Sequence, residues 1–108
     1  MLKRREYAGS APGSLEGVRI ADLSRLFAGN LLTQILGDFG AEVVKVESPE
    51  GDNMRWVWPF RNPGMGHIFL NANRNKRSVV LDLKKDGGRE ACLALAAKTD
   101  VMVYNIRP

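Results

Sequence analysis

The sequence of 108 residues predicts an α/β fold, a mostly parallel sheet whose strands are joined by crossover helices. The first observation is a set of runs rich in valine, isoleucine and leucine, at 18–23, 43–46, 78–83 and 101–104. The second and the fourth of these runs are nearly continuous in apolar residues, as in parallel strands that are covered on both faces. The second observation is a helical apolar repeat between the first two runs and another between the last two. Strands and helices that alternate in this way are typical of βαβ units.

The helix expected after the first strand has an apolar stripe. Leu31, Ile35 and Phe39 recur at every fourth position, so we expect this face to pack against the core. Asn30 is expected to cap the start of the helix through its side chain, and Gly40 to end it in a left-handed conformation. A right-handed crossover then brings the turns after the first and second strands to the same edge of the sheet, where open α/β sheets bind ligands.

The segment 48–66 is rich in glycine, proline and asparagine, but it also carries Trp56, Trp58 and Phe60. A loop of this length inside a domain is usually a lid, a binding loop or part of an interface. Two interpretations stay open at this point. Either the tryptophans pack against sequence outside this chain, or they wall an apolar slot for a substrate, with arginines at its rim.

A brief strand is expected at His67–Leu70, followed by a polar turn. The turn places Arg74, Lys76 and Arg77 close together, and its asparagines favour tight backbone conformations. The sequence therefore predicts either a solvated basic turn or a site at which these cations meet an anion together. His67 is expected to be structural or exposed rather than catalytic, because no partner for it is visible in the sequence.

The last helix is expected at about 89–98, with Cys92 as a small buried side chain on its apolar face. It leads into the apolar run 101–104, which we interpret as a buried parallel strand. The sequence ends shortly after this run, without a helix that could cover it. We therefore expect the chain to be the N-terminal part of a longer protein and to be incomplete as a fold on its own.

Composition is that of a soluble globular domain. The net charge of +4 and the pI of about 9.6 favour anionic partners, without deciding between nucleic acid, a membrane surface and a phosphorylated small molecule. A single cysteine excludes an internal disulfide framework, and no apolar run reaches the length of a membrane helix. We expect a cytoplasmic protein. Residues 1–14 lack a signal-peptide pattern and are expected to form a disordered tail, ahead of residues 15–108, which are expected to be the N-terminal part of one domain.

Several strand ends are expected to meet at one edge of the sheet, namely 24–30, 47–48, 84–85 and 105–107. A ligand at this edge would meet a helix N-terminus and several cations, which suits a phosphorylated nucleotide. Glu47 lies where a dinucleotide-binding fold has its ribose-binding acid. The first turn, however, has no G-x-G-x-x-G pattern and the sequence has no P-loop, which argues against a nicotinamide dinucleotide. Zinc-spaced cysteines and histidines are absent too, so the sequence assigns no metal site.

Four stretches of the sequence, taken in order, resemble a known family. They are LEGVRIADLSRLFAGN, LLTQILGDFGAEVVKVESPEGD, NANRNKRSVVLDLK and DVMVYNIRP. Together they resemble the N-terminus of the class III CoA-transferases, the formyl-CoA transferase or CaiB-BaiF type, over about Leu15 to Pro108. The resemblance implies a Rossmann-like CoA-binding domain within a much longer enzyme that forms an interlocked homodimer. It also implies an acyl-CoA and a free carboxylic acid as substrates, so that coenzyme A is a substrate and no separate cofactor is expected.

The resemblance further implies which residues contact CoA. By their positions in the family's motifs they are Phe27, Ala28, Ser48, Leu81, Asp82, Leu83, Lys84, Asn105, Ile106 and Arg107. The basic turn adds Arg74, Lys76 and Arg77 as candidates for the phosphates. Ser48 stands where some members have an arginine, so one ionic contact to a CoA phosphate is expected to be missing here.

In the resembled enzymes an aspartate attacks the thioester and forms first a mixed anhydride and then an aspartyl-CoA thioester. None of the aspartates in this sequence matches that motif, so no catalytic residue is assigned and the chain alone is expected to be inactive. The family also contains α-methylacyl-CoA racemases, which this part of the sequence does not separate from transferases. Alternatives from other classes are a basic nucleic-acid-binding module and a non-catalytic homologue used for interaction.

Overall fold

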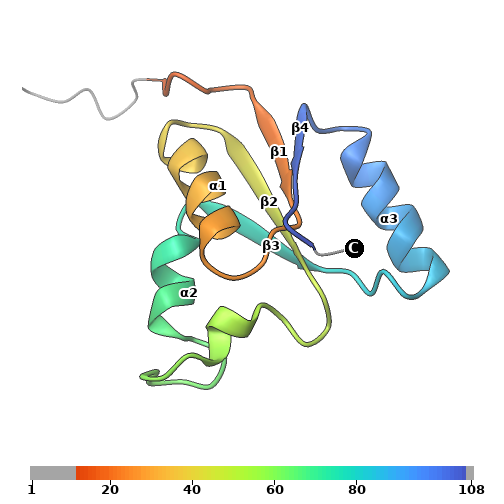
Figure 1. Cartoon of the computed structure of the whole chain (residues 1–108). Helices are drawn as coiled ribbons and strands as arrows, with labels where there is room; N and C mark the ends of the chain where they lie inside the picture. Colours follow the sequence, from red (N-terminus) through yellow and green to blue (C-terminus); the bar gives the residue numbers. More distant parts are fainter. Residues whose placement is uncertain (1–11, 107–108) are drawn as a thin grey trace, which may run out of the picture.

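The computed structural model describes residues 12–106, and within this range four strands form one sheet that is accompanied by helices (Figure 1). The elements in chain order are β1 (Arg19–Asp22), α1 (Ala28–Asp38), β2 (Glu42–Glu47), the 3₁₀ helix η1 (Asn53–Trp56), α2 (His67–Ala72), β3 (Lys76–Val80), α3 (Asp86–Ala96) and β4 (Val101–Val103). The predicted α/β class is confirmed. Most of the expected tail at 1–14 lies outside the described residues; at its end, Gly13 lies against the backbone of Gly40.

Neighbouring strands are all parallel, in the order β3-β2-β1-β4. The register pairs Ile20 of β1 with Val43 of β2 on one side and with Val101 of β4 on the other. The chain therefore extends the sheet through β2 and β3 and then returns to add β4 on the opposite side of β1. This reversal makes the carboxyl ends of β1 and β4 a topological switch point, the place where open α/β sheets bind ligands.

The apolar core lies between α1 and the amino-terminal half of the sheet. Its buried centre and the half-buried residues packed around it are Ile20, Ala41, Val43, Leu15, Val18, Leu36 and Val103. Further along β2, Lys45 and Glu47 follow Val43 on the same face, because side chains alternate along a strand. Both are buried, so the layer between helix and sheet changes from apolar to ionic toward the carboxyl edge.

Apart from Leu36, α1 presents a polar face to the sheet, which corrects the expectation of an apolar one. Its buried residues are Gly29, Asn30, Thr33 and Gln34. Ile35 and Phe39, from the expected apolar stripe, are 44% and 55% exposed. The physical reason lies in the sheet below, where Asp22 and Lys45 need hydrogen-bonding partners. Thr33 supplies one to Asp22 at 2.5 Å, and Asn30 supplies one to Lys45 at 2.6 Å.

Asn30 is not the cap of α1. The helix begins one residue after Phe27, which occupies the N-cap position and makes no side-chain cap bond. Asn30 lies inside the first turn, fully buried, and its amide donates hydrogen bonds to the carbonyl of Leu26 and to the Asp52 carboxylate. Gly40 follows the end of the helix with a φ of +102°, as predicted.

Residues 67–72 form the helix α2, and the prediction of a strand there was wrong. Phe69 and Ala72 are the buried residues of α2 and lie three apart, on one face of the helix. The guanidinium of Arg55 lies 3.8 Å from the centre of the Phe69 ring. The side chain of Asn73 donates to the Phe69 carbonyl at 3.0 Å, so this asparagine stabilises the end of a helix instead of a tight turn.

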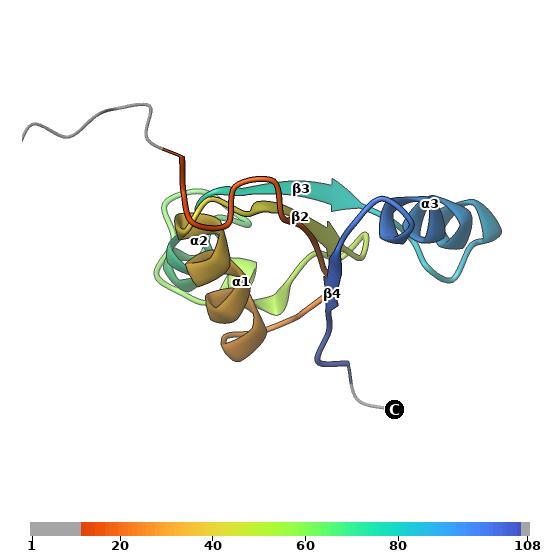
Figure 2. The same ribbon diagram turned by 90° about the horizontal axis from the view of Figure 1, so that it is seen from above.

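β3 and α3 both begin earlier than predicted, at Lys76 and Asp86. No residue of α3 is buried, and Cys92 is half-buried rather than enclosed. Figure 1 and Figure 2 show α3 apart from α1 and α2, on the other side of β4 in the view of Figure 1. Among residues 12–106, no helix has both the length and the apolar character needed to cross a membrane.

Candidate functional site

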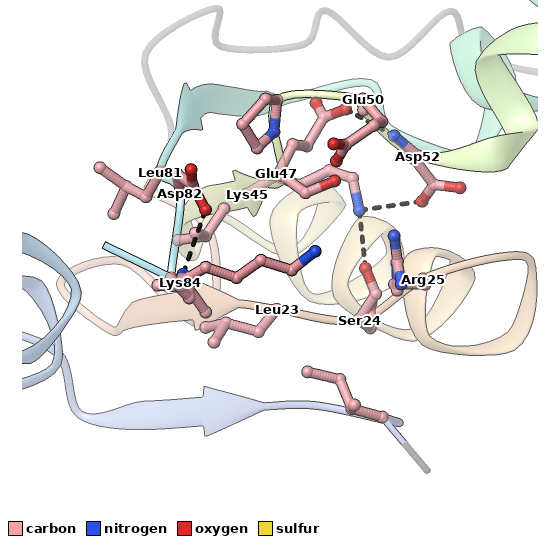
Figure 3. Close-up of a pocket in the computed structure, with 16 residues that line it drawn as sticks. Leu23, Ser24, Arg25, Lys45, Glu47, Glu50, Asp52, Leu81, Asp82 and Lys84 are labelled. Atoms are coloured by element: carbon pink, nitrogen blue, oxygen red, sulfur yellow. Dashed lines mark hydrogen bonds and ion pairs between the residues drawn. The ribbon is translucent and has the colours of Figure 1, made fainter. Parts of the chain in front are cut away.

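A cavity of about 350 Å³ opens at the carboxyl edge of the sheet (Figure 3). Its walls come from the turns that follow every strand. They are Leu23, Ser24 and Arg25 after β1, residues 45–52 at and after the end of β2, residues 81–84 after β3, and Ile106 after β4. The convergence of strand ends predicted from parallel order is therefore confirmed for the described residues.

Part of the set predicted to contact CoA lines this cavity. Those residues are Ser48, Leu81, Asp82, Leu83, Lys84 and Ile106. Phe27 and Ala28 are exposed at the start of α1 and do not belong to the lining. Arg107 lies outside the described residues.

Asn105 stands beside the cavity, but both polar groups of its side chain are used within the protein. Its Oδ1 accepts a hydrogen bond from the Arg25 amide at 2.7 Å, and its Nδ2 donates to the Arg25 carbonyl at 2.8 Å. The side chain also lies near Gly29, where an added Cβ would be 3.4 Å from its Nδ2. Asn105 therefore holds the turn after β1 in place, with its amide already satisfied.

The three cations of the basic turn do not meet at one site, contrary to one of the two predictions. Lys76 and Arg77 are the first two residues of β3. They therefore lie toward the amino ends of the strands, away from the cavity. Each cation instead has a carboxylate of its own. The pairs are Arg74 with Asp38 at 2.7 Å, Lys76 with Asp22 at 3.0 Å, and Arg77 with Glu42.

Trp56 and Trp58 do not wall this cavity. They are 55% and 78% exposed, and neither belongs to the lining, so the predicted apolar slot is not formed here. His67 is also exposed, with Nδ1 3.2 Å from the Pro59 carbonyl oxygen. This contact agrees with the structural interpretation of the histidine.

Among the cations that line the cavity, Arg25 and Lys84 are available to bind a ligand. Within residues 12–106, neither side chain makes an ion pair or a side-chain hydrogen bond, and Figure 3 shows Lys84 extending into the cavity. The third cation, Lys45, is 1% exposed and lies 3.2 Å from Asp52. The Ser48 hydroxyl is buried and has no hydrogen-bond partner in the described part of the chain. An anion in the cavity would therefore meet Arg25 and Lys84 first.

The carboxylate of Glu47, at the end of β2, accepts hydrogen bonds from several groups of the protein. It accepts two hydrogen bonds from Arg55, each of 2.7 Å, one from Ser78 at 2.7 Å and one from the Asp52 amide at 3.0 Å. Burial raises the pKa of Glu47, but the bonds from Arg55, Ser78 and the Asp52 amide outweigh it and lower the pKa from 4.5 to about 2. Glu47 is thus ionised, and its oxygens are hydrogen-bonded within the protein. A ribose-binding acid, which its position in the sequence suggested, would have an oxygen free for the ligand.

Next to the cavity lies a buried network that sequence analysis did not identify. The Lys45 ammonium donates to the Asn30 side chain at 2.6 Å and to the Ser24 carbonyl at 2.9 Å, and it pairs with Asp52. The signal in the sequence was Lys45 itself, a charge inside the apolar run 43–46. A lysine buried in a sheet requires a carboxylate partner, and the search for one leads to Asp52.

Comparisons with known proteins identify the family. The model of CoA-transferase family III matches residues 15–108. An acyl-CoA transferase of Fusarium pseudograminearum is 43% identical over 112 residues, which cover 95% of this chain and 25% of the relative. The succinyl-CoA:glutarate CoA-transferase of Mus musculus is 49% identical over 96 residues, which cover 87% of this chain and 22% of the relative.

A solved structure shares the fold. The crystal structure of a CaiB/BaiF family protein from Brucella suis superimposes with a TM-score of 0.83 at 38% identity, over 89% of this chain and 26% of that one. The chain thus spans about a quarter of the length of the relatives that it matches. Because the family model covers nearly all of the sequence, the chain belongs to CoA-transferase family III.

Proposed function

We propose that this chain forms the CoA-binding part of an enzyme that transfers coenzyme A from an acyl-CoA thioester to a carboxylic acid. The observation that carries the proposal is the cavity at the carboxyl edge, bordered by Arg25 and Lys84, which have no ion-pair partner among residues 12–106, in a chain of this family. Relatives that share the matched region are named for CoA transfer, among them the succinyl-CoA:mesaconate CoA-transferase of Haloarcula hispanica, 44% identical over 99 residues.

The chemistry of the cavity suits the nucleotide end of coenzyme A. Arg25 and Lys84 would bind phosphate oxygens through charge-assisted hydrogen bonds. Leu23, Leu81 and Ile106 offer apolar surface to a base. A volume of about 350 Å³ is near the lower end of the range for ligand pockets. The cavity would therefore enclose one part of CoA and leave the rest of the molecule to lie along the surface.

The transferase hypothesis is favoured over the racemase and nucleic-acid alternatives. The relatives described above are named for CoA transfer. In addition, Glu50 and Asp82 border the cavity beside Lys84, and such carboxylates oppose the approach of a continuous phosphate backbone. We further propose that coenzyme A acts as a substrate without a separate cofactor, and that the enzyme is an interlocked homodimer in the cytoplasm. These last points rest on the family resemblance and on the single cysteine.

Calorimetric titration of the chain with CoA, under conditions where circular dichroism shows the chain to be folded, tests the proposal. We expect saturable binding, and we expect Arg25→Ala and Lys84→Ala each to weaken it roughly tenfold or more, because a hydrogen bond to a charged group contributes about 1.5–3 kcal/mol. Lys98→Ala is the matched control, since Lys98 is exposed and does not line the cavity.

Unchanged affinity in both variants would remove Arg25 and Lys84 from the site, and no binding of CoA by the wild type would overturn the assignment of the cavity. Binding to duplex DNA with a steep dependence on salt would instead favour the nucleic-acid alternative.

A further inference from the structure

The turn between β1 and α1 holds Leu26 in a conformation that its side chain disfavours. Leu26 has a φ of +63°, in the left-handed region where residues other than glycine are uncommon. Two buried side chains hold its peptide groups. The Asp52 Oδ1 accepts from the Leu26 amide at 3.3 Å, and the Asn30 amide donates to the Leu26 carbonyl at 2.5 Å. The conformation of this turn therefore depends on residues that lie elsewhere in the chain.

Asp52 contributes most to this arrangement, because both of its oxygens are used. Oδ1 also accepts from the Met54 amide at 3.0 Å, and Oδ2 accepts from Asn30 at 2.7 Å and lies 3.2 Å from the Lys45 ammonium. The Asp52 amide in turn donates to Glu47 at 3.0 Å. Asp52, which is 3% exposed, joins the turn after β1 to the turn after β2 and the start of η1.

These two turns are opposite walls of the cavity. The first carries Ser24 and Arg25, and the second carries residues 48–52. Figure 3 shows Lys45 between them, with dashed lines to Ser24 and Asp52. Because Asp52 belongs to the second turn and its carboxylate accepts from the Leu26 amide in the first, the separation of the two turns follows from its position.

We propose that Asp52 is a positioning residue for the cavity: its carboxylate fixes the turn that carries Arg25 relative to the turn that carries Ser48, and Lys45 neutralises it from below. The role rests on the proposed CoA site, but it is a separate claim about how that site keeps its shape. The competing interpretation is that the Lys45–Asp52 pair stabilises the fold as a whole and has no particular effect on the cavity.

A pair of double variants separates the two interpretations. Both carry Lys45→Met, which removes the charge that would otherwise be left unpaired. One adds Asp52→Asn, which keeps an oxygen that can accept from the Leu26 and Met54 amides. The other adds Asp52→Ala, which removes it. The two proteins have the same net charge and differ only in the group that joins the turns.

We expect the variant with alanine to bind CoA at least about tenfold more weakly than the variant with asparagine, at a temperature where circular dichroism shows both to be folded. The amide and Cα NMR shifts of Leu26 should leave their left-handed values only in the alanine variant. Asp38→Asn serves as the control, because Asp38 lies at the far end of α1 in an exposed ion pair with Arg74. Equal affinities and equal Leu26 shifts in the two doubles would overturn the proposal.

The wild-type chain gives a measurement that does not depend on the folding of any variant. The Leu26 amide should be strongly protected from hydrogen exchange, since its acceptor is a buried carboxylate; exchange as fast as in an open loop would overturn the proposal. Failure of the proposed function has a different signature, because the wild type would then not bind CoA although its Leu26 amide is protected.

Discussion

Lys76 and Arg77 are neighbours in β3, yet strand alternation sends their side chains to opposite faces of the sheet. Lys76 reaches the layer under α1, where its side chain is 2% exposed and pairs with the fully buried Asp22. Arg77 pairs with Glu42 at the surface, and its side chain is 71% exposed. Two neighbouring cations that the sequence does not distinguish therefore contribute differently to the free energy of unfolding.

Lys76→Ala is expected to lower the free energy of unfolding by roughly 3–5 kcal/mol, because it leaves Asp22 buried without its cation. Arg77→Ala is the control and should cost no more than about 1 kcal/mol, since its ion pair is exposed. Urea unfolding followed by circular dichroism measures both changes. If the two variants were equally stable, the buried pair would have no special contribution.

Glu47 gives the stability of the fold a dependence on pH. Its pKa is about 2 in the folded chain against an ordinary 4.5, so the unfolded chain takes up the proton first as the pH falls. The contribution is present above about pH 4.5 and is lost toward pH 2, and it amounts to roughly 2–3 kcal/mol. Acid unfolding of the wild type and of Glu47→Gln tests this. The variant should lose less stability across that range, and parallel curves would contradict the assignment.

For single residues, the sequence predicted where a side chain lies in the fold better than which groups it binds. Parallel strand order was enough to place Ser48 and Lys84 at one edge, because every strand of a parallel sheet ends there. It could not show that Asn105 and Glu47 are satisfied inside the protein. Their partners come from turns that meet only after folding; Asn105 and Arg25, for example, are 80 positions apart.

α1 illustrates how a helix can lie where the sequence predicted it and yet bury a mostly polar face. The apolar repeat located the helix, but the charges on β1 and β2 require a polar face, so Thr33 points inward and Ile35 outward. Thr33 donates to the buried Asp22 at 2.5 Å. Periodicity alone does not identify the inner face when the surface beneath the helix is ionic.

The orientation of α1 has a direct test in two substitutions of similar size. Thr33→Val should lower the free energy of unfolding by roughly 1–3 kcal/mol, because it removes a hydrogen bond to a buried carboxylate. Ile35→Gln should change it by no more than about 0.5 kcal/mol, since Ile35 is 44% exposed. Thermal unfolding in the same buffer compares them. A larger loss for Ile35→Gln than for Thr33→Val would mean that the apolar face is the buried one after all.

α2 was missed for a different reason. The stretch His67–Leu70 is short and apolar, and periodicity cannot distinguish a strand from one turn of helix over so few residues. The helix is selected by tertiary contacts, since Phe69 and Ala72 are buried three apart and Arg55 lies over the Phe69 ring. Arg55 is fixed by Glu47, so the ionic layer at the end of β2 also determines the form of α2.

For the molecule as a whole, the sheet is the part that sequence reasoning described best. Alternating apolar runs and helical repeats predicted parallel strands, and the order β3-β2-β1-β4 places the switch point at the edge where the ligand site was expected. β4, which was expected to be a buried strand, has Val101 and Met102 each 43% exposed, so that prediction was wrong. The expected packing of the last helix was the least accurate part. Its apolar residues predicted a buried face, yet Leu93 is 70% exposed and no residue of α3 is buried.

This contrast predicts a gradient of local stability within the chain. Amides of β2, which has Val43, Lys45 and Val46 buried, should exchange with solvent only through global unfolding. Amides of α3 should exchange through local opening, because little buried surface is lost when that helix frays. Hydrogen exchange followed by NMR measures both sets in one sample, and Leu93→Ser should leave the exchange of β2 unchanged. If α3 were as strongly protected as β2, its contacts with the rest of the chain would have to be far more stabilising than its exposure implies.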